Sequence, residues 1–238
     1  CLLACWLGWC LSVWLRGTLL NMPRGQGATR LAAQLKRRLP SEARLGLYAW
    51  HYLTHRQEDA LPGRGTRTSQ IDAESGPGGH LQDTSSCDAA LDASVRALGE
   101  LGGSSLILGT PASMTPGAVG RRRVRGFFER CASREIDLVW EPTGLWTPQD
   151  IMSVVGGTSA RGVLSDTEVS HAGGEVADSA WVRVGGAGQA VHLGHAQAES
   201  LAFLLEDCFS DQPARVVFSG PRAFSNLRNF HKATSQLA

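Results

Sequence analysis

Charged side chains follow several short apolar runs of the sequence, at positions where buried strands would end. Glu141 comes directly after Ile-Asp-Leu-Val-Trp, Asp166 follows Gly-Val-Leu-Ser, and Arg183 lies within Trp-Val-Arg-Val. Two carboxylates at one site are the groups that hydrolases use as acid and base or as metal ligands. An arginine beside them would bind an anion or pair with a carboxylate. The pattern therefore predicts Glu141 and Asp166 as catalytic residues and Arg183 as a substrate-binding residue.

Three further polar or aromatic residues are candidates for contact with a substrate. Asn21 follows the first apolar run, His55 follows the second, and Trp146 lies five residues beyond Glu141. His55 and the histidine four residues before it would share a face only on a helix, so we predict no metal site from them. A structural alternative stays open for each carboxylate. Glu141 would hold the next loop, and Asp166 would cap a helix or a turn.

Apolar runs alternate with helical patterns along most of the chain, and this alternation predicts parallel strands with right-handed crossovers. Seven strands with helices between them are one fewer than a (β/α)8 barrel contains. In such a barrel the charged residues above would share one mouth. A doubly wound sheet is the alternative, although no glycine-rich fingerprint follows the first strand. The expected strands are Leu11–Leu20, Leu45–Trp50, Ser104–Leu108, Ile136–Trp140, Gly162–Leu164, Trp181–Val184 and Arg215–Phe218.

The composition is that of a globular α/β protein. The 238 residues carry a formal net charge of +1, which gives no basic excess for nucleic acid, and 42% of them are apolar. The uncharged start, Cys1 to Leu15, is shorter than the roughly 20 residues of a membrane span, so we expect a soluble, cytoplasmic protein without a membrane partner. None of the six cysteines forms a C-x-x-C pair, and Cys87, in a polar stretch, is expected to be the most exposed.

Residues 56 to 86 break the alternation of strands and helices. They contain Gly, Pro, Ser, Thr and Asp with almost no large apolar residue. Such a segment buries too little surface to offset the entropy lost on ordering. We therefore predict one barrel domain over residues 1–238, with a long, mobile polar loop at about 56–86 that lies outside the core.

Three segments of the sequence carry a resemblance to a known family. They are Tyr48-Ala-Trp-His-Tyr-Leu-Thr-His55, Leu106-Ile-Leu-Gly-Thr-Pro-Ala-Ser-Met-Thr-Pro116 and Val139-Trp-Glu-Pro-Thr-Gly-Leu-Trp146. Together they resemble the YecE-like family, also called domain of unknown function 72 (DUF72), whose fold is a (β/α)8 barrel. The resemblance covers nearly the whole chain in order and spacing. The family's opening strand has no counterpart here. The resemblance therefore implies a barrel whose first strand is missing or altered, with an open seam between its terminal strands.

Several polar positions of the family are changed in this chain. Tyr48 stands where the family usually has Lys, Thr143 where it has Arg, and Gly185 where it has His. Four residues, Glu141, Trp146, Asp166 and Arg183, favour a hydrolase or lyase that acts on a small polar or phosphorylated substrate. The changed positions favour the alternative, a barrel that has lost catalysis and binds a small-molecule or anionic ligand or serves a structural role. The sequence leaves enzymatic activity, cofactor and oligomeric state open.

Overall fold

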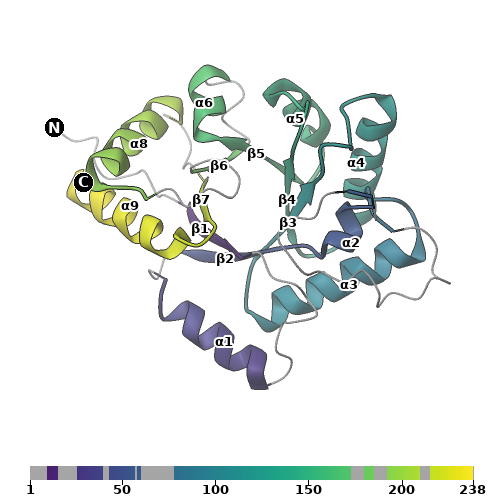
Figure 1. Ribbon diagram of the computed structural model, residues 1–238, viewed down its shortest axis with the longest axis horizontal. Coiled ribbons are helices and arrows are strands. Elements are labelled where there is room, and N and C mark those ends of the chain that lie inside the picture. Colours follow the sequence, from purple (N-terminus) through teal and green to yellow (C-terminus); the bar gives the residue numbers. More distant parts are fainter. Residues whose placement is uncertain are drawn as a thin grey trace.

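The computed structural model describes residues 10–15, 26–39, 43–56, 58–59, 78–172, 180–184, 192–209 and 215–237. Strands and helices alternate through these residues (Figure 1). The strands are β1 (Cys10–Leu15), β2 (Arg44–Tyr48), β3 (Ser105–Thr110), β4 (Asp137–Pro142), β5 (Arg161–Ser165), β6 (Ala180–Arg183) and β7 (Arg215–Ser219). The helices are α1 (Gln26–Lys36), α2 (His51–Thr54), α3 (Ser85–Glu100), α4 (Ala118–Cys131), α5 (Pro148–Val155), α6 (Asp166–Ala172), α8 (His195–Cys208) and α9 (Ala223–Leu237).

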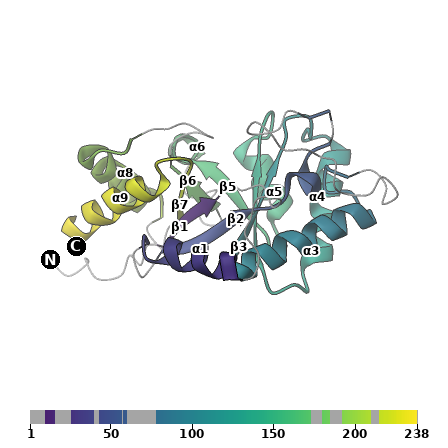
Figure 2. The same cartoon turned by 60° about the horizontal axis from the view of Figure 1, so that its bottom comes forward.

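The described strands form a closed parallel barrel in the order β1-β2-β3-β4-β5-β6-β7. All seven predicted strands are present in it, so the predicted barrel-type fold is confirmed and the doubly wound alternative is wrong. The expected open seam is also wrong, because β1 pairs directly with β7 from Cys10 opposite Arg215 to Trp14 opposite Ser219. Figures 1 and 2 show helices around the strands, with α8 and α9 on one side and α3 and α4 on the opposite side.

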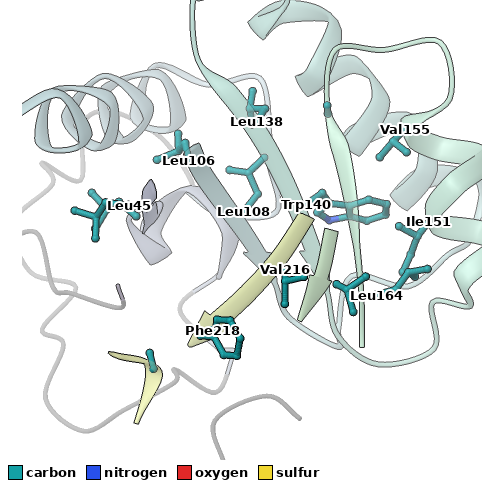
Figure 3. Close-up of a cluster of buried hydrophobic side chains, with 14 of the residues drawn as sticks. Leu45, Leu106, Leu108, Leu138, Trp140, Ile151, Val155, Leu164, Val216 and Phe218 are labelled. Atoms are coloured by element: carbon teal, nitrogen blue, oxygen red, sulfur yellow. The ribbon is translucent and has the colours of Figure 1, made fainter. Parts of the chain in front are cut away.

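Side chains on each strand alternate between the inside of the barrel and the layer of helices. Leu106, Leu108 and Trp140 point outward into the main hydrophobic core, where Ile151 of α5 packs near Trp140 (Figure 3). The inward-facing residues form a second, smaller cluster. It consists of Tyr48, Ile107, Val139, Val163, Trp181 and Val217, one residue from each strand from β2 to β7. This inner cluster closes the interior below the residues at the carboxyl ends of the strands.

The polar stretch of residues 56–86 is only partly as predicted. Leu81 is 1% exposed and belongs to the main core, and α3 begins within the stretch at Ser85. Cys87 is fully buried, so the expectation of an exposed thiol is also wrong. The polar composition of the whole stretch gave no indication that Leu81 packs into the core and anchors the end of the stretch. The predicted mobility concerns mainly residue 57 and residues 60–77, which lie outside the described residues.

The start of α5 shows how the sequence fixes the loop that follows β4. Thr147 caps α5, because its hydroxyl accepts the amide of Asp150 at 3.2 Å while the Asp150 carboxylate accepts the amide of Thr147 at 3.1 Å. Pro148 occupies the first position of this helix, where its missing N–H costs nothing.

Within the described residues, no helix is long and apolar enough to span a membrane.

Candidate functional site

A buried ion pair lies inside the barrel, near the carboxyl ends of β4 and β6. Glu141 follows Val139 by two residues and Arg183 follows Trp181 by two, so both side chains point inward with the inner cluster below them. Glu141 is 3% exposed and Arg183 is 9% exposed. Nε of Arg183 lies 2.5 Å from Oε1 of Glu141, although its N–H is not aligned for a regular hydrogen bond. The sequence-based prediction that these two side chains meet is confirmed.

Tyr48, at the end of β2, completes this cluster. Its phenol donates a hydrogen bond to Oε2 of Glu141, across the barrel from β6. The glutamate is therefore held by a cation on one oxygen and by a phenol on the other. Sequence reasoning treated Tyr48 only as the loss of a lysine. Tyr48 lies on the inward face of β2 with the inner cluster, and a buried tyrosine hydroxyl usually finds a hydrogen-bond partner, which was the signal that could have found it.

Arg183 retains donors that the described residues do not use. Its Nη1 is buried and has no hydrogen-bond partner among the residues that the structure describes. Burying a charged donor without a partner is unfavourable, because water no longer solvates it. A ligand oxygen placed beside Nη1 would remove that cost, and an anionic oxygen would remove most of it. Glu141 therefore orients the Arg183 guanidinium, and Nη1 can still donate a hydrogen bond to a polar or anionic group.

Asp166 begins α6 directly after β5. Its Oδ1 accepts the amide N–H of Thr167 at 3.1 Å, and the side chain is half-buried. Ser165 precedes it as a cap, since the Ser165 hydroxyl accepts the Glu168 amide and the Glu168 carboxylate accepts the Ser165 amide. A carboxylate in the first turn also interacts favourably with the helix dipole. These contacts match the helix-start role that the sequence left open, and the catalytic role of Asp166 stays a prediction.

Among the other predicted substrate contacts, the described residue Trp146 does not lie at the ion pair. Trp146 is 6% exposed, packs at 4.8 Å between ring centroids against Trp140, and donates its indole N–H to the carbonyl of Met114. Trp140 points outward, so Trp146 lies on the helix side of the sheet and forms no aromatic wall beside Glu141. Its role in substrate binding stays a prediction. Asn21 lies outside the described residues.

The two histidines after β2 have separate surroundings. Nδ1 of His55 lies 2.8 Å from the hydroxyl of Thr54, and the His55 side chain is half-buried. Burial lowers the pKa of His51, whose Nε2 has no hydrogen-bond partner among the described residues. In the part of the chain that the structure describes, no three His, Cys, Asp or Glu side chains gather as metal ligands. The role of His55 in substrate binding stays a prediction.

A second polar cluster joins three segments that are distant in the sequence. Nε2 of His80 lies 2.8 Å from Oδ2 of Asp59 and 3.1 Å from the hydroxyl of Ser113, which donates to the other oxygen of Asp59. Burial acts to raise the pKa of Asp59, but hydrogen bonds from Ser113, the Arg56 amide and His80 together lower it. Sequence reasoning missed this cluster, since nothing local connects residues 59, 80 and 113.

The residue types of this second cluster are those of a serine hydrolase, but the wiring is different. A catalytic histidine receives the serine proton on one ring nitrogen and is oriented by the carboxylate through the other. Here Asp59 and Ser113 both contact Nε2 of His80, and the serine proton is directed at Asp59. This arrangement leaves no free base for Ser113. The cluster instead ties the segments before and after residues 60–77 to the loop between β3 and α4.

Comparison with solved structures supports the fold. A DUF72 family protein from Enterococcus faecalis V583 matches with a TM-score of 0.54 at 10% identity, over 93% of this chain and 84% of that protein. The resemblance to the DUF72 family is thus confirmed at the level of the fold. A D-tagatose 3-epimerase-like protein matches with a TM-score of 0.47 at 11% identity over 95% of this chain and 85% of its own.

A third similar structure is 3-keto-L-gulonate-6-phosphate decarboxylase from Vibrio cholerae. Its TM-score is 0.45 at 10% identity, over 97% of this chain and 99% of that protein. No family model matches the sequence, and no curated protein matches it either. The likeness to the DUF72 family protein therefore supports the barrel fold alone and identifies no substrate.

Proposed function

We propose that the protein binds a small polar or anionic molecule at the mouth of its barrel, with Arg183 as the main contact. The observation that supports this proposal is the buried Nη1 of Arg183, which lacks a hydrogen-bond partner among the described residues. Glu141, which accepts a hydrogen bond from Tyr48, orients the guanidinium through the ion pair. The apolar inner cluster below them limits water, which strengthens a charged contact.

A pair of matched variants tests this proposal. Arg183→Met removes the proposed contact, whereas Arg215→Met removes another inward arginine, at the opposite end of the barrel, that pairs with Asp137 at 3.9 Å. The probes are D-glycerate and glycerol 3-phosphate, followed by thermal shift, and bromide, located by its anomalous signal in crystals. We expect bromide beside Nη1 of Arg183, and stabilisation by at least one organic probe. Both should be lost in Arg183→Met and kept in Arg215→Met.

The proposal fails if no ion occupies the barrel mouth of the wild-type protein. It also fails if both variants lose binding equally, because a general loss of positive charge would then account for the effect. Both arginines are replaced by the same apolar residue, methionine, so the two variants can be compared directly. Arg215 is more exposed than Arg183, so Arg215→Met controls for the loss of one positive charge from the barrel and not for the loss of a buried arginine.

A hydrolase or lyase with Glu141 as acid or base is the second candidate function. It is favoured by one observation, the direct hydrogen bond between the Tyr48 phenol and the buried Glu141 carboxylate, which could pass a proton between them. Under this proposal Glu141→Gln abolishes turnover of a substrate that still binds. If Glu141 only braces Arg183, the same variant loses stability while ligand binding persists.

A further inference from the structure

A pocket of about 300 Å³ lies between the start of α3 and one face of α4, and its lining is strongly basic. Arg122, Gly126 and Arg130 follow each other at intervals of four residues, so they form one stripe along α4. Arg123 lies beside this stripe. The opposite wall includes Asp83 and its neighbours before α3. Three guanidinium groups therefore face a pocket whose lining contains one carboxylate.

The charges on α4 are not equivalent. Arg121 pairs with Asp150, and Arg125 lies 3.7 Å from Glu129, so these two arginines have acidic partners on the surface. By contrast, neither Arg122 nor Arg123 has an acidic partner within the described residues. Both of these arginines line the pocket, together with Arg130, which has an acidic partner at its edge.

Arg130 and the amino end of α3 also place positive charge at the wall of the pocket. Nε of Arg130 lies 3.6 Å from Asp83, and its Nη2 donates to the carbonyl of Gln82 at 3.2 Å, which fixes the guanidinium at the pocket wall. Thr84 then caps α3, a helix of 16 residues that begins at the same wall. The amino end of a helix carries partial positive charge, which adds to the attraction for an anion.

Gly126 keeps the middle of the arginine stripe open. A Cβ at this position would meet no other atom within 4 Å, so packing inside the protein does not require glycine there. Glycine within a helix is less favourable than alanine. The absence of a side chain at Gly126 leaves space between Arg122 and Arg130, where an anionic group could contact both flanking guanidinium groups.

We infer that this pocket between α3 and α4 is a second binding site, for a phosphate group. Phosphate fits because it has several charged oxygens that can accept from more than one guanidinium at once. The volume lies at the lower end of the range for small-molecule pockets, so the ligand is a free phosphate ion or the phosphate of a small ester. This site is separate from the barrel mouth and does not depend on the proposed function of Arg183.

The test uses the full chain, with inorganic phosphate and glycerol 3-phosphate titrated calorimetrically at constant ionic strength. We expect saturable binding that weakens about tenfold or more in Arg122→Gln/Arg123→Gln, since each lost contact is charge-assisted. The matched control is Arg125→Gln/Arg228→Gln, which removes the same charge elsewhere on the surface. It should bind as the wild-type protein does. Tighter binding of glycerol 3-phosphate identifies an ester ligand, similar affinity shows that only the phosphate group is recognised, and binding of phosphate alone identifies the free ion.

Three results would overturn the inference. One is an absence of saturable binding of either probe. Another is equal weakening in the control variant, which would show a general effect of charge. The third is loss of phosphate binding in Arg183→Met with full binding in Arg122→Gln/Arg123→Gln. That result would place the phosphate at the barrel mouth, supporting the proposed function while refuting the second site.

Discussion

Substituting Glu141 by glutamine should destabilise the protein strongly. The side chains of Glu141 and Arg183 are only 4% and 11% exposed, so the variant leaves a buried guanidinium without its counter-charge. Removing one partner of a buried ion pair costs about 3–5 kcal/mol. Glutamine keeps the volume and can still accept from Tyr48, which favours the lower end, about 3 kcal/mol. For a domain of this size that loss corresponds to a fall in Tm of roughly 6–12 °C.

The ion pair at the other end of the barrel provides the matched control. Nη1 of Arg215 lies 3.9 Å from Asp137, and these side chains are 41% and 34% exposed. Water screens such a pair, so Asp137→Asn should cost no more than about 1 kcal/mol. The two substitutions change the same chemistry, carboxylate to amide, on the same strand. Their difference therefore isolates the effect of burial.

A double-mutant cycle separates the charge effect from a loss of packing. Arg183→Met alone leaves the Glu141 carboxylate buried and unbalanced, whereas Glu141→Gln/Arg183→Met removes both charges. The double variant should therefore be more stable than the sum of the single losses predicts. The assay is urea unfolding followed by circular dichroism. Equal losses in Glu141→Gln and Asp137→Asn, or an additive double variant, would refute the interpretation of Glu141 and Arg183 as a buried, mutually dependent pair.

Two further substitutions test single hydrogen bonds on opposite faces of the sheet. Tyr48→Phe should lower the free energy of unfolding by about 1.5–3 kcal/mol, because a buried carboxylate, Glu141, loses a donor; unchanged stability in urea would count against that bond. Trp146→Phe should cost about 1–3 kcal/mol, because the carbonyl of Met114 loses the indole N–H. The two losses should add in the double variant, and clear non-additivity would show that the two faces are coupled.

The strands and the central ion pair could be predicted because local patterns encode them. Alternation of apolar runs with helices placed every strand near its observed position, and parallel topology then brought the end of β4 near that of β6. Glu141 and Arg183 follow from this topology together with the cost of burying an unpaired charge. Barrel closure did not follow, because the pairing of β1 with β7 depends on the curvature of all seven strands rather than on either segment.

The parts that could not be predicted depend on contacts between distant segments or on chain direction after a strand ends. Trp146 follows Pro142, where strand alternation stops, so its side of the sheet could not be determined from periodicity. The contact of Ser113 with His80 and Asp59 joins three loops with no shared pattern. Tyr48 was read as a lost charge, whereas the barrel uses its hydroxyl as a donor to the same glutamate that Arg183 contacts.

The cluster around Asp59 should make stability fall in acid. Burial opposes ionisation of Asp59, but hydrogen bonds from Ser113, the Arg56 amide and His80 hold its pKa below the ordinary value. A carboxyl whose pKa is lowered by folding stabilises the folded state fully above its unfolded pKa, about 4, and loses that contribution as the pH falls through the lower folded pKa. Asp59→Asn keeps the shape and removes the titration. The wild-type protein should therefore exceed Asp59→Asn in urea stability at about pH 5, roughly one unit above that pKa. This advantage should shrink steadily below about pH 4. An advantage that persists undiminished at the acid end would show that the stabilisation does not come from the ionised carboxylate.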